Sequence, residues 1–151
     1  MSVKGAQATI TKAVTGWDGV TSAPHRFGGV EYGLGTREIG HIHGDHMVDI
    51  PFPKKVRDEI VAAGRAQPHH ILPETGWVSF YLRQEVDVEQ AIALLYESYQ
   101  IAQKQKSKTI EVKNEQQTYR RNWRNRATRR RCSTKTFGRR LAGPRVDAGC
   151  Q

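Results

Sequence analysis

The chain has 151 residues, which is enough for one domain with a modest core and a tail. Its formal net charge of +9 comes from residues 114–151, because residues 1–113 carry 13 basic and 13 acidic side chains. The overall charge therefore says nothing about the function of the neutral body. No segment approaches the roughly 18 apolar residues of a transmembrane helix, and residues 1–7 lack the apolar run of a signal peptide. We expect a cytoplasmic protein with no membrane partner.

Hydrophobic spacing predicts a helix near the N-terminus, followed by strands. Ile10, Val14 and Trp17 recur at i, i+4 and i+7, so residues 5–15 should form a short amphipathic helix. Residues 16–24 contain Gly, Asp and Pro and are expected to form a loop. Alternating apolar residues then predict three strands, over residues 27–34, 37–43 and 46–52.

The next part of the chain predicts two more helices and one strand. A helix should begin at Pro53, whose missing N–H suits a first turn, and end at Gly64, which suits a C-terminal cap. After a loop, residues 77–83 alternate as a strand. Asp87 is the expected N-cap of a last helix, with Gln90 completing a capping box, and the apolar stripe continues to about Gln105.

These elements predict an α+β fold, with a small antiparallel sheet in a meander of about four strands and helices packed on one side. The folded domain is expected over residues 1–108. Residues 109–151 form a basic tail with few apolar residues, which predicts disorder. The two cysteines, Cys132 and Cys150, lie in this tail and lack metal-ligand spacing.

Three of the six histidines, His41, His43 and His46, lie in one predicted hairpin. Strand alternation predicts that Ile39, His41 and His43 share a face. A two-residue loop at Gly44-Asp45, the favoured turn, would place His43 opposite His46. A three-residue loop would instead place His41 opposite Asp49, because a slip of one residue turns the second strand over.

Three interpretations of this hairpin remain open. His41 and His43 could bind a metal together with His46 or Asp49. Alternatively, one histidine deprotonates an acidic enol or phenol while a second histidine, or Arg37, stabilises the anion. The third interpretation is that these are interior histidines, bonded to backbone or carboxylates. We expect no cofactor, and a metal at His41 and His43 is the less favoured alternative.

The candidate site residues follow from this hairpin and from the segment near the last strand. His69-His70 precede a proline-containing loop that leads to Trp77, and they are placed to close over the hairpin. The catalytic candidates are His41 and His43. The candidates for binding a small-molecule substrate are Arg37, Glu38, His46, His70 and Trp77.

The tail contains seven arginines within residues 119–131, interleaved with two aromatic residues. Arginine pairs with phosphates and aromatic rings stack on bases, so this segment is a candidate for weak, nonspecific binding of nucleic acid. The favoured alternative is a disordered extension with incidental affinity for polyanions. The candidate residues are Arg120, Arg121, Trp123, Arg124, Arg129, Arg130 and Arg131.

The motif Arg37-Glu38-Ile39-x-His41-x-His43, the His70 region, the Gly76–Phe80 strand and the Asp87–Tyr99 helix together resemble the luciferase-like domain of small bacterial proteins and fungal luciferases. The resemblance covers about residues 17–102. It implies oxidation of a hydroxylated pyrone by O2 without metal or organic cofactor, as in the fungal enzymes. The resemblance extends to the residues Glu38, His41, His43 and Trp77. The chain departs from the fungal pattern in its shorter hairpin and in lacking an N-terminal anchoring segment.

This resemblance makes the leading hypothesis a luciferase-like domain with a small-molecule pocket at the histidine hairpin. The pocket would serve cofactor-independent oxidation of a phenolic or enolic substrate. The alternative is a non-catalytic binding or adaptor module whose arginine-rich tail contacts nucleic acid.

Overall fold

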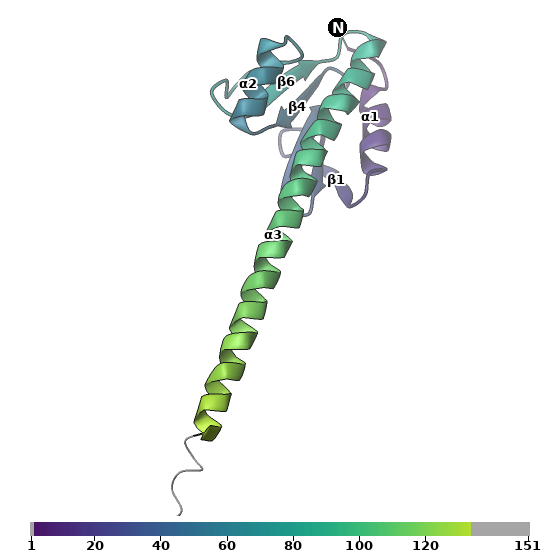
Figure 1. Cartoon of the computed structure of the whole chain (residues 1–151). Coiled ribbons are helices and arrows are strands. Elements are labelled where there is room, and N and C mark those ends of the chain that lie inside the picture. Colours follow the sequence, from purple (N-terminus) through teal and green to yellow (C-terminus); the bar gives the residue numbers. More distant parts are fainter. Residues whose placement is uncertain (1, 134–151) are drawn as a thin grey trace, which may run out of the picture. The chain divides into compact units, whose positions relative to one another are not determined.

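A computed structural model describes residues 2–133, with side chains described up to residue 124 (Figure 1). Contacts divide the chain into two units, Met1–Ser107 and Lys108–Gln151. The elements in chain order are α1 (Ala6–Thr15), β1 (Val20–Pro24), β2 (Val30–Leu34), β3 (Arg37–His43), β4 (Met47–Pro51), α2 (Lys54–Ala62), β5 (Gln67–Pro68), β6 (Trp77–Tyr81) and α3 (Glu85–Ser133).

The strands form one antiparallel sheet in the order β1-β2-β3-β4-β6-β5, which confirms the α+β fold. The four predicted strands are the four central ones. The expected loops over residues 16–24 and before residue 77 were wrong in part, because each contains a short edge strand, β1 and β5. Neither carries an alternating apolar pattern: β1 is largely exposed and ends at Pro24, and β5 is two residues long. Edge strands pair on one side only and bury little, so they leave a weak signal.

One face of the sheet is covered by α1 and the first part of α3 (Figure 1). Ile42, Val48, Ile50 and Val78 are fully buried on this face and belong to the same apolar core as the stripes of both helices. α2 packs against β6 and adds Ile60 to this core. The opposite face of the sheet is not covered by α1 and α3 and carries a different set of side chains.

A β-bulge in β3 changes which residues share a face. Tyr32 pairs with Gly40, but the next residue of β2 pairs with Glu38, so Ile39 is the extra residue. The predicted face shared by Ile39 and His41 is therefore wrong: Ile39 is fully buried in the core, whereas Glu38 lies beside His41. Gly40 has φ +151°, and a Cβ there would lie 2.5 Å from an α3 side chain, so the bulge and the close helix both favour glycine.

The loop between β3 and β4 has three residues, since His43 pairs with Met47 and His41 pairs with Asp49. The favoured two-residue turn was thus wrong, and the second predicted register is the one observed. Asp45 in this loop accepts hydrogen bonds from the backbone N–H groups of Gly5 and Gln7, each at 2.9 Å. The carboxylate caps α1 from a distant part of the chain, which lowers the pKa of Asp45.

The last helix differs from its prediction at both ends. α3 begins at Glu85, and Asp87 lies in its first turn, where its Oδ2 accepts from the backbone N–H of Arg83 at 2.7 Å and of Gln84 at 3.0 Å. Asp87 therefore caps by reaching back and is not the N-cap residue. The helix does not end near Gln105 but continues to Ser133, although its apolar stripe stops where we expected.

Residues 134–151 of the basic tail, including Cys150, lie outside the described residues. The side chains of Arg129, Arg130 and Arg131 also lie outside them. Within the described part of the chain, no helix is long and apolar enough to cross a membrane.

Candidate functional site

The sheet face that α1 and α3 leave uncovered carries a cavity of about 1150 Å³. Small-molecule sites typically measure about 300–1000 Å³, so this cavity is slightly larger than most sites of that class. All six histidines of the chain line this cavity. They come from three separate segments: the turn between β1 and β2, the β3–β4 hairpin, and the loop between β5 and β6. This gathering makes the cavity the candidate site.

Asp49 on β4 is the centre of the site and is fully buried. Its Oδ2 atom lies 3.4 Å from His41 Nε2, 3.3 Å from His43 Nε2 and 3.5 Å from His69 Nε2. None of these contacts is a hydrogen bond, so Oδ2 is a buried acceptor without a partner among the described residues. Its other oxygen, Oδ1, accepts a hydrogen bond of 2.5 Å from Ser79 Oγ. Buried polar atoms are normally paired, which marks Oδ2 as a functional atom.

His41 lies between two carboxylates. Its Nδ1 is 2.5 Å from Glu38 Oε1, and its Nε2 faces Asp49. A carboxylate faces each ring nitrogen, an arrangement that favours the doubly protonated, cationic form of His41. Burial, the largest single influence, lowers the pKa of His41, but Asp49 and Glu38 together raise it to about 9. In turn His41 and Ser79 outweigh the effect of burial on Asp49 and lower the pKa of that carboxyl.

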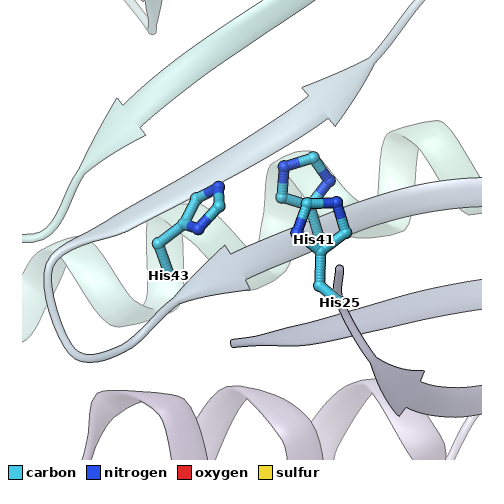
Figure 2. A group of neighbouring side chains, drawn as sticks. All are labelled: His25, His41 and His43. Carbon is cyan, nitrogen blue, oxygen red and sulfur yellow. The ribbon is translucent and has the colours of Figure 1, made fainter. Parts of the chain in front are cut away.

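His43, in contrast to His41, favours its neutral form. Burial first, and then the neighbouring His41 cation, lower the pKa of His43, so it is neutral near pH 7. The His43 ring meets the His41 ring edge-on, with centroids 4.9 Å apart. His25 stacks on His41 at 3.9 Å, as Figure 2 shows, and its Nδ1 is buried without a hydrogen-bond partner among the described residues. The His41 ring thus contacts two further imidazole rings, which also contact each other at 5.4 Å.

His69 has a defined tautomer. Its Nδ1 accepts hydrogen bonds from the backbone N–H groups of Ile71 at 3.2 Å and Leu72 at 3.0 Å. Nδ1 therefore carries no proton, and in the neutral ring the proton sits on Nε2, facing Asp49. Burial lowers the pKa of His69, which favours this neutral form. His69 positions the loop that follows it and does not present a free base to the cavity.

His70 reaches Asp49 through Ser79. The single hydroxyl proton of Ser79 is donated to Asp49, so Ser79 Oγ accepts from His70 Nδ1 at 3.1 Å and from its backbone N–H at 3.3 Å. The His70 side chain is exposed at the cavity edge. Asp49 consequently organises both the β3 histidines and those of the β5–β6 loop.

The donor atoms of the cavity are of a kind that binds divalent metals. Three groups each bring three donor atoms within 4.8 Å of one another: His25 with His41 and His43, Asp49 with His69 and His70, and His25 with Glu31 and Glu38. Imidazole nitrogens together with a carboxylate suit zinc and other first-row transition metals. The cavity could therefore serve acid–base chemistry or metal binding.

Comparison with protein families bears on this cavity. Residues 36–98 match the family model of the Luciferase domain. Over this segment the chain is similar to the Luciferase domain. The match confirms the resemblance seen in the sequence, and it spans β3, β4, α2, β5, β6 and the start of α3. No curated protein and no solved structure matches the chain.

Within the Luciferase domain, most predicted site residues meet at the cavity. Those that line it are Glu38, His41, His43, His46, His70 and Trp77. The Trp77 ring lies 5.3 Å from the His41 ring, and His46 is exposed in the hairpin loop. Arg37 does not line the cavity, because the bulge at Ile39 places Glu38 on that face instead.

Four residues at the site were not among the predicted catalytic or substrate-binding residues: His25, Asp49, His69 and Ser79. Of these, the sequence predicts Asp49 only as an alternative metal ligand, and it places His69 near the hairpin. Two of them carried a signal: a charged Asp49 between Val48 and Ile50 is costly in a buried strand unless it is paired, and Ser79 interrupts an apolar strand. His25 had no such signal, since it lies in a turn outside residues 36–98.

Proposed function

We propose that the Luciferase domain binds an acidic enol or phenol in the histidine cavity, removes its proton and supports its oxidation by O2. The observation that carries the proposal is the position of His41 and His43, whose Nε2 atoms lie 3.4 and 3.3 Å from the same buried oxygen of Asp49 and whose pKa values are moved in opposite directions. Neighbouring groups whose pKa values are moved apart are the usual arrangement for an acid–base pair.

In this mechanism one proton passes from the substrate hydroxyl to a ring nitrogen of His43 or His25. The resulting enolate keeps its negative charge, and the His41 imidazolium stabilises it. Because burial and the adjacent cation lower the pKa of His43, it is a weak base, which restricts the substrate to acidic hydroxyl groups. O2 is the proposed electron acceptor, since a deprotonated enol donates electrons more readily than the neutral one.

The first test uses 7-hydroxycoumarin, a phenol whose neutral and ionised forms absorb at different wavelengths. Binding next to a partly buried cation should lower the pH at which the bound phenol ionises, by about one pH unit or more. His41→Gln removes the cation and should abolish this change. Lys12→Gln, which removes an exposed positive charge from α1, should preserve it.

Two results would overturn the proposal. The first is an unchanged ionisation of the coumarin, or the same change in His41→Gln. The second is one equivalent of metal in the purified chain, together with loss of coumarin binding when that metal is chelated. If the coumarin behaves as expected, oxygen uptake in the presence of a 3-hydroxy-2-pyranone tests the oxidation step, and His43→Gln should reduce its rate by about 10²-fold or more.

A second candidate function concerns the second unit, where we propose weak binding of single-stranded nucleic acid. The α3 helix places Tyr119 and Trp123 one turn apart, 72% and 64% exposed, with Arg120 and Arg121 beside them. Aromatic rings this exposed are unusual unless they have a partner, and arginines next to them favour phosphates.

Deletion of residues 114–151 tests this second function directly. Binding of fluorescent poly(U) should be lost, while the thermal unfolding of the first unit remains. Trp123→Ala should weaken binding by about fivefold or more, corresponding to loss of one stacked base. Equal binding by the full chain and the deletion variant would refute a role for this segment.

A further inference from the structure

Part of the rim of the histidine cavity is apolar, in contrast to its floor. In the described part of the first unit, five large apolar side chains are markedly exposed: Phe27, Val86, Tyr96, Ile71 and Leu72. Three of these line the cavity, with Phe27 71%, Ile71 70% and Leu72 51% exposed. A grouping of exposed apolar residues around a polar site marks a surface that contacts a partner.

The first rim segment is the turn of residues 25–29 between β1 and β2. Its backbone is closed by hydrogen bonds between His25 and the glycines Gly28 and Gly29. A Cβ on Gly29 would lie 1.8 Å from the carbonyl oxygen of Ile42, so the turn is held against β3. Phe27 meets the His25 ring edge-on at 5.6 Å, and His25 stacks on His41. A continuous series of rings therefore connects the rim to the cationic floor.

The second rim segment is the loop after His69. The backbone N–H groups of Ile71 and Leu72 both donate hydrogen bonds to Nδ1 of His69. The other ring nitrogen of His69, Nε2, faces Asp49. The backbone carrying both apolar side chains is thus anchored to the same carboxylate that organises the floor. Each rim segment is tied to the floor by one histidine, and Phe27, Ile71 and Leu72 line the same cavity as the floor residues His41 and Asp49.

We infer that the ligand of this cavity is amphipathic, with an acidic hydroxyl head at the His41–Asp49 floor and an apolar tail of several carbons between Phe27, Ile71 and Leu72. The inference rests on the proposed function for the head group and adds the class of the tail. The three rim residues set specificity for tail length and take no part in proton transfer.

A homologous series of 7-hydroxycoumarins with methyl, propyl and heptyl chains at position 4 tests the inference. All members share one head group, so differences in affinity report the tail. Affinity should rise about two- to fourfold per methylene as the chain reaches the rim, because each buried methylene contributes roughly this factor. The double variant Phe27→Ser, Leu72→Ser should remove most of this gain.

The matched control is Val86→Ser, at an apolar residue that is 49% exposed and does not line the cavity. It should retain the full dependence on chain length, which separates a rim effect from a general loss of surface hydrophobicity. If the methyl compound binds but the heptyl compound binds no more tightly, the inference is wrong and the proposed function stands. If no member of the series binds, both are wrong. A chain-length dependence that survives in the double variant also refutes the rim as its source.

Discussion

The charged state of His41 should make the stability of the first unit depend on pH in the alkaline direction. The folded chain raises the pKa of His41 from 6.5 to about 9, because Asp49 and Glu38 outweigh burial. A group whose pKa is raised by folding stabilises the folded state fully below its unfolded pKa and loses this contribution as pH rises through the folded pKa. The stabilisation by His41 should therefore be lost as pH rises from 6.5 to about 9.

The size of the effect follows from the same two pKa values. Each tenfold difference in proton affinity corresponds to about 1.4 kcal/mol, so a rise from 6.5 to about 9 amounts to about 3 kcal/mol. The His41 side chain is 9% exposed, and solvent therefore screens this interaction little. Folding lowers the pKa values of His43 and His69, so their neutral forms stabilise the folded state at higher pH. This contribution to the free energy of unfolding is lost as pH falls below 6.5. The free energy of unfolding should have its maximum near pH 6.5.

Urea unfolding of the full chain at intervals between pH 5.5 and 9.5 measures this dependence. The free energy of unfolding should fall by about 3 kcal/mol between pH 6.5 and about 9 in the wild type. In His41→Gln, which cannot be charged, the fall should shrink to below about 1 kcal/mol. His46→Gln removes an exposed histidine of the same cavity and should keep the wild-type profile. A flat wild-type profile over this window, or an equal fall in His41→Gln, would refute an imidazolium held between two carboxylates.

Three further predictions concern residues around this ion pair. Asp49→Asn should lower the pKa of His41 from about 9 to below about 8 in an NMR titration, and a pKa that stays near 9 would assign the effect to Glu38 alone. Gly40→Ala should destabilise the chain by about 1–3 kcal/mol in urea, since its backbone strain and its contact with α3 add together, whereas Gly33→Ala, with ordinary contacts, should change little. Ser79→Ala removes the donor to a buried carboxylate and should cost about 1–3 kcal/mol by the same measurement; a neutral result would mean that the hydrogen bond is not made.

Periodicity in the sequence was sufficient for the central elements of the fold. The alternation of Val78 and Phe80 with Ser79 correctly separated the core face of β6 from its other face. The spacing of Ile10 and Val14 located α1. These patterns depend on side-chain burial repeating every two or every 3.6 residues, which is a local property of the chain. Hydrophobic periodicity does not reveal edge strands. It also gives no sign of the part of α3 that lies beyond the apolar stripe.

The candidate site was predictable only in outline. The concentration of histidines in residues 41–46 indicated chemistry, and the three-residue loop was one of two registers left open. The bulge at Ile39 was not predictable, because it is favoured by pairing with β2 on one side and by packing of Gly40 under α3 on the other. Without it Glu38 would lie on the core side, and His41 would have one carboxylate partner instead of two.

The sequence by itself determined the element types, the neutral body with a basic tail, and the presence of an unusual cluster of imidazoles. Only the tertiary structure decided which groups meet. The hairpin loop carries Asp45 to the N-terminus of α1, and distant turns bring His25 to the His41 ring and His69 to the carboxylate of Asp49. The physical reason is that protonation and hydrogen bonding depend on contacts between residues far apart in the chain, whereas hydrophobic periodicity depends on neighbours.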